Sequence, residues 1–340
     1  HSGETDHDLK IRHPYKEWME KNVRRLVPFE DLPDDQVGTR ELDDDLLSSY
    51  QKQFNYSNEE LDTVIRVLGE NGQEAVGSMG DDTPFAVLSS QPRIIYDYFR
   101  QQFAQVTNPP IDPLREAHVM SLATSIGREM NVFCEAEGQA HRLTFKSPIL
   151  LYSDFKQLTT MQEEHYRADT LDITFDATEA TLEETVKALC DKAEQMVRNG
   201  TVLLVLSDRN IAKNRLPVPA PMAVGAIQTR LVDKSLRCDA NIIVETASAR
   251  DPHHFAVLLG FGATAIYPYL AYETLAKLVD GQAIDKDYRT VMLNYRNGIN
   301  KGLYKIMSKM GISTIASYRC SKLFEAVGLH DDVAELCFQG

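Results

Sequence analysis

Apolar runs of strand length alternate with helix-like segments along the second half of the chain. Strands are predicted at residues 171–175, 202–206, 241–244 and 264–267, where aliphatic and β-branched side chains gather. Helices are predicted between and after them, at residues 181–200, 222–231, 252–259, 270–279 and 288–310. Such an alternation builds parallel βα units with helices on the outside. The sequence therefore predicts an α/β fold, a partial or distorted TIM-like βα-barrel.

The first half of the chain gives weaker signals. Residues 1–56 are predicted to be a lead-in strap with one short helix, 15–26, anchored by Trp18. Ser57 and Glu60 form a capping box that begins the next helix. Shorter predictions are strands at 85–88 and 312–315, β-structure near 131–134 and 142–145, helices at 93–103 and 320–327, and no regular structure at Pro109, Pro110 and Pro113.

Composition limits the classes of function. The chain of 340 residues has 36 basic and 50 acidic residues, a net charge of −14, which argues against nucleic acid or an anionic membrane as the main partner. No apolar run is long enough to span a bilayer, and no secretory signal opens the chain. The five cysteines form no CxxC pair or Cys/His cluster, so no metal site is expected. Reduced thiols in a cytoplasmic protein are the simplest interpretation.

Polar residues follow several predicted strands, where βα-barrels place function. They are Asp176, Ser207, Asp208, Arg209, Glu245, Thr246, Tyr267 and the segment Ser317–Arg319. These residues could form an active-site ring. They could also cap the helices that follow, as polar loop residues commonly do, and this second interpretation is favoured.

Two local motifs suggest chemistry but have simpler explanations. Gly260–Thr264 could cradle a phosphate, yet a strand follows at once, so a helix-to-strand turn explains it better. Asp251–His254 could serve acid–base or metal chemistry, but adjacent histidines point to different faces and no third ligand stands at a standard spacing. No nucleophile elbow, dinucleotide loop or Walker loop occurs. We therefore predict no catalytic, cofactor-binding or metal-ligating residue.

Two segments differ from ordinary packing sequence. Gly77–Pro84 contains two glycines, two acids and a proline, and its glycines permit unusual backbone angles. Gln105–Pro113 contains three prolines, which bias each preceding residue to extended geometry. An irregular connector is the alternative interpretation. A stiff wall beside a glycine loop suits a lining or docking surface more than catalysis.

Gly77–Pro84, Gln105–Pro113 and Gly260–Tyr269 resemble the central domain of the large subunit of bacterial glutamate synthase. Lys309–Arg319 and Leu323–Leu329 resemble the entrance to the FMN-binding synthase domain of that family. The matches extend over nearly the whole chain. The resemblance implies a lead-in strap at residues 1–56, the central domain at 57–310 and the start of a truncated synthase domain at 311–340.

The resemblance also implies a function. The family's complete enzyme makes L-glutamate from L-glutamine and 2-oxoglutarate with NADPH, using FMN and an iron–sulfur cluster in the large subunit and FAD with the small subunit. Its central domain resembles the FMN domain but holds no cofactor, links the glutaminase and synthase domains, and contributes to the internal ammonia tunnel. The glutaminase nucleophile is an N-terminal cysteine, whereas this chain has His1. The cluster cysteines and FMN phosphate loops are absent too, so the chain alone is expected to be inactive.

Partners implied by the resemblance are the glutaminase and synthase domains of the same chain and the small subunit. An ammonia tunnel needs dry walls with a few carbonyl or hydroxyl contacts. The glycine- and proline-framed candidates for that wall, or for a domain contact, are Gly80, Asp81, Asp82, Thr83, Thr107 and Asn108. One alternative is a free-standing FMN- or phosphate-binding barrel oxidoreductase that uses Glu245, Tyr267 and the Gly260–Gly262 turn. Another is a docking module for the small subunit.

Overall fold

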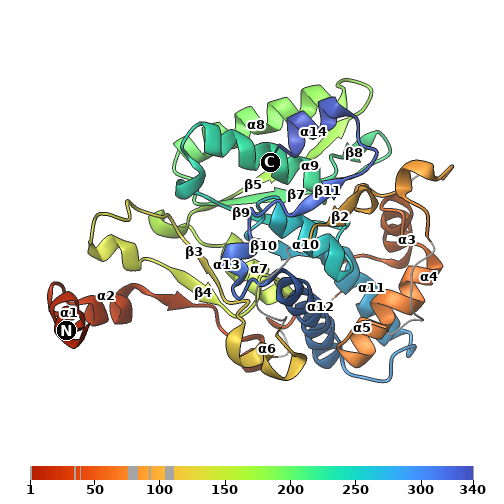
Figure 1. The fold of residues 1–340 in the computed structure, drawn as a ribbon. Coiled ribbons are helices and arrows are strands. Elements are labelled where there is room, and N and C mark those ends of the chain that lie inside the picture. Colours follow the sequence, from red (N-terminus) through yellow and green to blue (C-terminus); the bar gives the residue numbers. More distant parts are fainter. Residues whose placement is uncertain are drawn as a thin grey trace.

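The computed structural model describes residues 2–33, 36–38, 40–75, 83–91, 93–103 and 111–339. Its centre is a four-stranded parallel sheet in the order β10–β9–β7–β5 (Figure 1). The strands are β5 (Ala168–Asp172), β7 (Leu203–Ser207), β9 (Asn241–Glu245) and β10 (Ala265–Tyr267). Every residue of β7 and β9 is buried, which explains the continuous aliphatic runs in the sequence.

The strand order follows the chain order, as in a βα-barrel and unlike a doubly wound sheet with a switch point. The next parallel contact beyond β10 comes from Ile149, which bridges to Ile266. After Ile149 the chain continues through α7 (Tyr152–Thr159) to β5, the strand at the opposite edge of the sheet from β10. Within the described residues the sheet stays open. The predicted α/β fold of parallel βα units is thus confirmed, in the form of a partial barrel.

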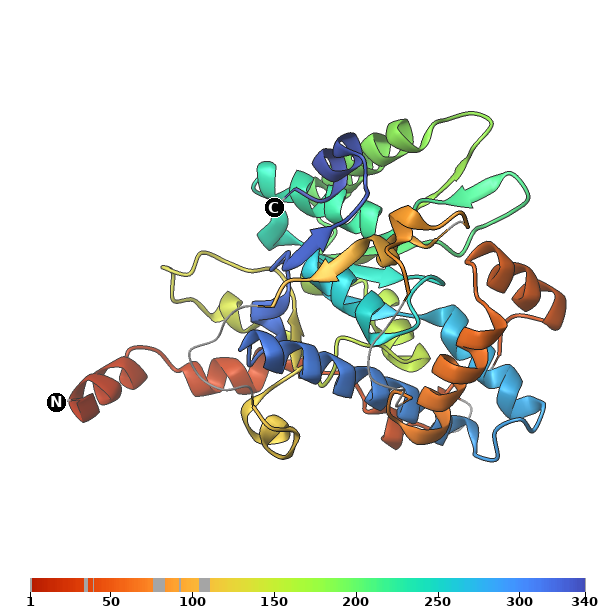
Figure 2. The ribbon, with the colours of Figure 1, turned by 45° about the vertical axis from the view of Figure 1, so that its right-hand side comes forward.

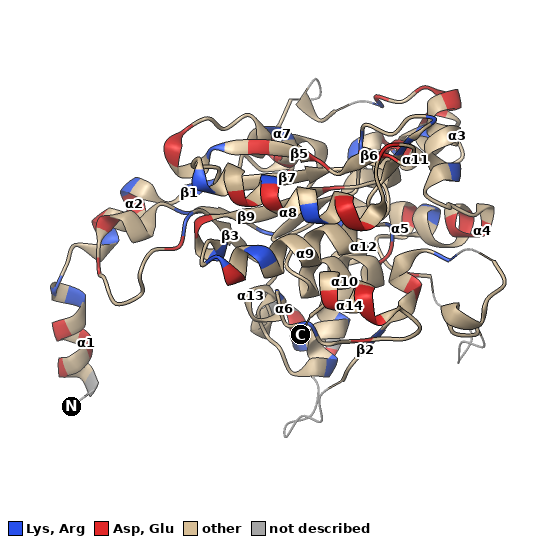
Figure 3. Cartoon of the chain, turned by 90° about the horizontal axis from the view of Figure 1, so that it is seen from above, with Lys and Arg blue, Asp and Glu red and all other residues tan. Residues whose placement is uncertain are grey.

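The longer helices follow the strands as expected, and α14, at the end of the chain, was not predicted. They are α8 (Leu182–Arg198), α9 (Ala220–Asp233), α10 (Pro252–Gly260), α11 (Tyr269–Asp280), α12 (Tyr288–Met310) and α14 (Asp331–Cys337). In Figure 1, α8, α9 and α14 pack together at the top, and α11 and α12 contact each other lower down. Basic and acidic residues are interspersed along outer helices such as α8 (Figure 3), where Arg198 pairs with Glu194 at 2.8 Å.

The N-terminal part begins with α1 (Ser2–Ile11) and α2 (Tyr15–Asn22), which project from the rest of the molecule (Figures 1 and 2). The chain then joins a small sheet as β1 (Arg24–Arg25), beside β4 (Leu143–Phe145) and β3 (Thr124–Ile126). After η1 (Phe29–Asp31) come α3 (Asp44–Gln53), α4 (Asn58–Glu60), η3 (Leu61–Ile65) and α5 (Arg66–Asn71). The Ser57–Glu60 capping box is present, as predicted.

The remaining elements are short. The helical turns and helices are η4 (Ala86–Leu88), η5 (Ile95–Tyr98), α6 (Pro113–Val119), η6 (Glu137–Ala140), η7 (Glu164–Tyr166), η8 (Arg237–Asp239) and α13 (Ile315–Tyr318). The strands are β2 (Phe99–Gln101), β6 (Thr174–Asp176), β8 (Arg215–Pro217) and β11 (Phe324–Ala326). No helix of the described residues is both long and apolar enough to cross a membrane.

Two helix predictions were wrong for one reason. Residues 93–103 and 320–327 instead contribute β2 and β11, which pair antiparallel with Phe324 opposite Gln101. The Phe99 ring packs against Phe261 and Phe338, with ring centroids 5.2 and 4.9 Å apart. A pairing between segments so distant in sequence overrides local helical preference.

Several shorter predicted elements also differ from the structure, each for a local reason. Residues 85–88 and 131–134 form turns and not strands, and 312–315 contribute only a bridge between Thr314 and Ser121. Pro113 begins α6, because Asp112 caps the helix and proline suits a first turn. The helix predicted at 15–26 ends at Asn22, where the chain turns extended to form β1.

Helices α5 and α12 pack closely at Gly298, where an added side chain would have no room. A Cβ added to Gly298 of α12 would meet Leu68 at 2.5 Å and the backbone nitrogen of Gln73 at 3.1 Å. Asn294 of α12 donates to the carbonyl oxygen of Gly69 (2.9 Å), which caps the end of α5.

Gly298→Ala is expected to destabilise the chain by about 1–2 kcal/mol, because overpacking outweighs the better helix propensity of alanine. Urea unfolding measures this loss. The matched control is Asn297→Ala at the neighbouring exposed position, which should leave the free energy of unfolding unchanged or raised. Equal or greater stability of the Gly298 variant would contradict the close crossing.

Candidate functional site at the carboxyl edge of the sheet

The carboxyl ends of β7 and β9 bring polar side chains into contact. Ser207 stands opposite Glu245 in the parallel register and donates its hydroxyl to the Glu245 carboxylate at 2.6 Å. Arg209 Nε donates to the other Glu245 oxygen at 2.5 Å. Thr246 Oγ1 donates to Asp208 Oδ2 at 2.6 Å. The structure thus assembles Ser207, Asp208, Arg209, Glu245 and Thr246, which the sequence had marked as strand-end candidates.

Arg209 is fully engaged within this cluster. Besides Glu245, its guanidinium pairs with Glu41 at 2.9 Å and lies over the Tyr269 ring, 4.3 Å from the centroid. Burial alone would lower the pKa of Arg209, but the adjacent Glu245 carboxylate raises it, so the guanidinium stays charged. The positive charge of Arg209 is therefore paired with carboxylates of the same chain.

Asp208 is in a different situation, because it is only 1% exposed and has no ion pair with a basic side chain of the described residues. Its carboxylate accepts hydrogen bonds from Thr246 and from the backbone N–H of Ala247 (3.0 Å). Burial raises the pKa of Asp208 to about 7, although these hydrogen bonds act in the opposite direction. A carboxyl group that exchanges protons near neutral pH therefore lies at the strand ends.

Segments from α3 to α4 cover this edge of the sheet. Tyr50 OH donates to the carbonyl oxygen of Arg209 at 2.6 Å, and Tyr56 OH donates to that of Ala247 at 2.7 Å. The Glu273 carboxylate of α11 accepts from the backbone N–H of Glu41 at 3.0 Å. The strand ends are thus occupied by the chain's own side chains.

Arg250 fixes the covering segments in place. It is 1% exposed, and its Nε donates to the Glu60 carboxylate at 2.8 Å. Its two terminal nitrogens donate to the carbonyl oxygens of Phe54 and Asn55, both at 3.1 Å, and the guanidinium lies over the Tyr56 ring. Burial would raise the pKa of Glu60, but Arg250 and Ser57 hold it below its usual value. The ion pair therefore stays charged.

The Asp251–His254 motif has a structural role. Asp251 caps α10 by accepting from the His254 backbone N–H at 3.0 Å. The His254 ring packs against Tyr96, with centroids 4.4 Å apart, and burial lowers its pKa to about 4, so it is neutral near pH 7. No group of three metal-ligating side chains occurs in the described part of the chain.

A pocket of about 450 Å³ borders the strand-end cluster. Its lining comes from the end of α3, the start of η5, the loops after β7 and β9, and the start of α9. Asp208 and Ser248, from the loops after β7 and β9, line it together with Lys52, Asn55 and Arg93. Sequence reasoning missed this pocket, because its parts come from five separate segments of the chain.

Other strand-end candidates lie elsewhere. Asp176 ends β6, which pairs with β8, and its carboxylate accepts from Thr178. Arg319 lines a separate pocket with Thr264, which precedes β10, so the Ser317–Arg319 segment lies at the amino edge of the sheet. That placement was wrong because residues 312–315 form no strand of the parallel sheet.

The predicted turn at Gly260–Thr264 is confirmed. Gly262 has a φ of +128°, and a Cβ on Gly260 would meet the Phe324 ring at 2.6 Å. Arg237 donates to the carbonyl oxygen of Gly262 at 3.2 Å. The glycines are required by the backbone and by the packing of Phe324.

Of the predicted tunnel residues, Gly80, Asp81, Asp82, Thr107 and Asn108 lie outside the described residues. Thr83 is described and exposed. The flanks of both segments contact one helix: Lys301 Nζ donates to the Gly72 carbonyl oxygen and Ser308 Oγ to that of Ile111, each at 2.8 Å. Seven residues of α12 separate these two anchors, about 10 Å along the helix.

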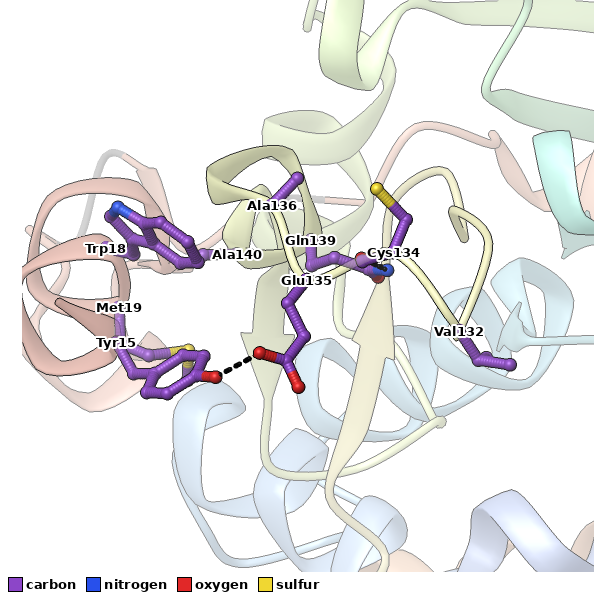
Figure 4. A pocket seen from close by; sticks show the side chains of 9 residues that line it. All are labelled: Tyr15, Trp18, Met19, Val132, Cys134, Glu135, Ala136, Gln139 and Ala140. Carbon is purple, nitrogen blue, oxygen red and sulfur yellow. Dashed lines mark hydrogen bonds between the residues drawn. The ribbon is translucent and has the colours of Figure 1, made fainter. Parts of the chain in front are cut away.

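A second pocket, of about 380 Å³, lies between α2 and residues 132–140 (Figure 4). Tyr15 donates to the Glu135 carboxylate at 2.5 Å across it, and the Trp18 and Met19 side chains lie on the same side as Tyr15. Nearby, Val132 and Phe133 are 83% and 95% exposed. This face is mainly apolar, which is typical of contact surfaces.

The fold and the covered strand edge define an α/β domain of parallel βα units whose strand ends are occupied by its own N-terminal segments. The family model described as the glutamate synthase central domain matches residues 49–330, and the chain belongs to that family.

Curated relatives agree with this assignment. The chain is 37% identical to the NADH glutamate synthase of Schizosaccharomyces pombe, over 99% of this chain and 16% of that protein. It is also 37% identical to the NADPH glutamate synthase large chain of Bacillus subtilis, over 99% of this chain and 22% of that protein. For the chloroplastic ferredoxin-dependent enzyme of Oryza sativa subsp. japonica the values are 37%, 99% and 21%. The chain thus spans about a fifth of the length of these relatives.

Solved structures add little. A flavocytochrome b2 variant with sulfite bound gives a TM-score of 0.35 at 9% identity, over 93% of this chain and 94% of that chain. A similarity of this size establishes neither a shared fold nor a shared ligand.

Asp208 and His254 are predicted to give opposite pH dependences of stability. Folding raises the pKa of Asp208 from 3.8 to about 7, so its contribution to the free energy of unfolding falls as the pH rises through that interval. Folding lowers the pKa of His254 from 6.5 to about 4, so its contribution rises with pH between those values.

The stability difference, variant minus wild type, should therefore grow with pH for Asp208→Asn and shrink with pH for His254→Gln. Each slope is at most about 1.4 kcal/mol per pH unit. Urea unfolding of the three proteins at several pH values from about 4 to 7 measures both slopes. Two pH-independent differences, or slopes of the same sign, would contradict the assigned protonation states.

Proposed function

We propose that this chain is the connecting central domain of a glutamate synthase. In this proposal the complete enzyme makes L-glutamate from L-glutamine and 2-oxoglutarate with NADPH, in the assimilation of ammonia. The observation that carries the proposal is the family match over residues 49–330, together with relatives of which the chain spans 16–22%. FMN and an iron–sulfur cluster would reside in other domains of the complete large chain, FAD and NADPH would act with a small subunit, and the enzyme would be cytoplasmic.

The chemistry of the strand edge favours a connecting role over catalysis. Glu245 is bonded to Ser207 and Arg209, and Arg209 is also paired with Glu41. These groups are already satisfied by one another and by the covering segments. A network of this kind holds elements together and leaves few of its groups available to a reacting molecule.

The residues of the alternative flavin site do not fit one FMN molecule. Glu245 and Tyr267 end β9 and β10, at the carboxyl edge. The Gly260–Gly262 turn precedes β10 and so lies at the amino edge, where Phe324 packs against Gly260. The buried strand β10 therefore lies between the turn and the other two residues, so the three groups do not face one common site. Titration with FMN, followed by flavin fluorescence, should accordingly show no binding, and micromolar affinity would favour the alternative.

The apolar face around α2 suits contact with another domain. Met19, Val132 and Phe133 are more than half exposed, at 54%, 83% and 95%. Exposed apolar groups gathered in this way mark interaction surfaces. We propose that the glutaminase or synthase domain of the same chain covers this face, and the small subunit is the alternative occupant.

The tunnel wall is proposed at Gly80, Asp81, Asp82, Thr83, Thr107 and Asn108. Support comes from the described flanks: Gly72 and Ile111 are held by Lys301 and Ser308 of the same helix. This common helix holds Gly72, which precedes the first segment, and Ile111, near the end of the second. The helix α12 would thus position the wall.

Thr83→Trp in the complete enzyme tests the tunnel. A bulky side chain in the wall should slow the glutamine-dependent rate by about tenfold or more, equivalent to about 1.4 kcal/mol, because ammonia must pass it. The rate with added ammonium chloride should stay unchanged, since external ammonia does not use the tunnel. Thr83→Ser is the matched control and should leave both rates unchanged. Two unchanged rates, or two that fall equally, would refute the tunnel assignment.

A further inference from the structure

The pocket beside Asp208 has the size and the location of a ligand site. Its volume of about 450 Å³ falls in the range of roughly 300–1,000 Å³ that is usual for small-molecule sites. It lies at the carboxyl ends of parallel strands, the edge at which α/β folds bind ligands. It is distinct from the proposed tunnel segments, none of whose described residues lines it.

One side of the pocket offers a buried carboxylate that has no positive partner. The nearby guanidinium of Arg209 is paired with Glu245 and Glu41, and that of Arg250 with Glu60. Within the described residues no lysine, arginine or histidine forms an ion pair with Asp208. A buried carboxylate is costly to ionise without a counter-charge. A ligand ammonium group would supply that charge.

The lining of the pocket also contains two basic residues. Lys52 and Arg93 both line it, and Arg93 is paired with Asp97 at 2.9 Å. Lys52 is exposed and forms no ion pair with a described residue, so it can meet an anionic group. Much of the remaining lining is apolar and stiff, formed by Phe54, Ile95 and the proline-rich segment 216–221.

We propose that this pocket binds a free α-amino acid with an uncharged side chain. The ammonium group lies on Asp208, the carboxylate faces Lys52, and the side chain lies against the apolar wall. The contacts to Thr246 and Ala247 hold the Asp208 carboxylate in position to receive the ammonium group. The proposal involves binding without a chemical reaction, so the bound amino acid would regulate or stabilise the domain. It is independent of the proposed connecting role.

Thermal unfolding and calorimetric titration of the chain with L-leucine and L-glutamine test the proposal. Binding with a dissociation constant of about 1 mM or tighter is expected. At about a hundred times that constant the Tm should rise by several degrees. Isopentylamine lacks the carboxylate of leucine and 4-methylpentanoate lacks its ammonium group, so both should bind at least about tenfold more weakly.

Two variants test which side chain contacts the ammonium group of the amino acid and which contacts its carboxylate. Asp208→Asn keeps the shape of the side chain but should abolish binding of the amino acids. Lys52→Met, at the exposed rim, should weaken the amino acids and leave isopentylamine unaffected. The matched control is Asp154→Asn, a buried carboxyl group that pairs with Arg296 outside the pocket, and it should retain the ligand-induced rise in Tm. Absence of binding, undiminished binding to the Asp208 variant, or binding of either analogue as tightly as L-leucine would overturn the proposal.

Discussion

Arg250 joins the N-terminal segments to the parallel sheet. Its guanidinium contacts the carboxylate of Glu60, the carbonyl oxygens of Phe54 and Asn55, and the ring of Tyr56. The backbone carbonyl oxygen of Arg250 accepts a hydrogen bond from Tyr295 OH of α12. Arg250 therefore contacts elements that precede it in the chain and a helix that follows it. Removing one partner of such a buried ion pair typically costs about 3–5 kcal/mol, because the other charge remains buried and unpaired. The arrangement of α3 to α5 over the strand ends depends on this contact.

This constraint explains the character of the strand edge. Because the covering segments are held close, Tyr50 and Tyr56 reach the backbone just after β7 and β9, and Glu41 reaches Arg209. In a βα fold this edge is where chemistry is usually located. Here it holds a bonded network, and within the described residues the buried Asp208 carboxyl group beside the pocket forms no ion pair with a basic side chain. A connecting domain with a small ligand site accounts for both features.

The sequence specified the elements whose signals are local. Helix α12 was predicted with the bounds Tyr288–Met310, and the capping boxes at Ser57 and Thr181 are both present. The parallel α/β fold followed from the order of strands and helices. The β2–β11 pair could not be predicted, because residues 99 and 326 meet only through tertiary packing. The strand-end residues Ser207 to Thr246 were recognised, but Glu41, which pairs with Arg209, and Glu60, which pairs with Arg250, come from segments with no motif that links them to the sheet.

Hydrogen–deuterium exchange of wild-type and Arg250→Met protein tests the central role of Arg250 most directly. The account predicts faster amide exchange in residues 44–71 of the variant, while the amides of β7 and β9 remain protected, because the sheet has its own buried core. Arg250→Lys, which keeps the charge but loses the forked donors, should lie between the two proteins. Unchanged exchange in residues 44–71, or a uniform increase over the whole chain, would contradict the account.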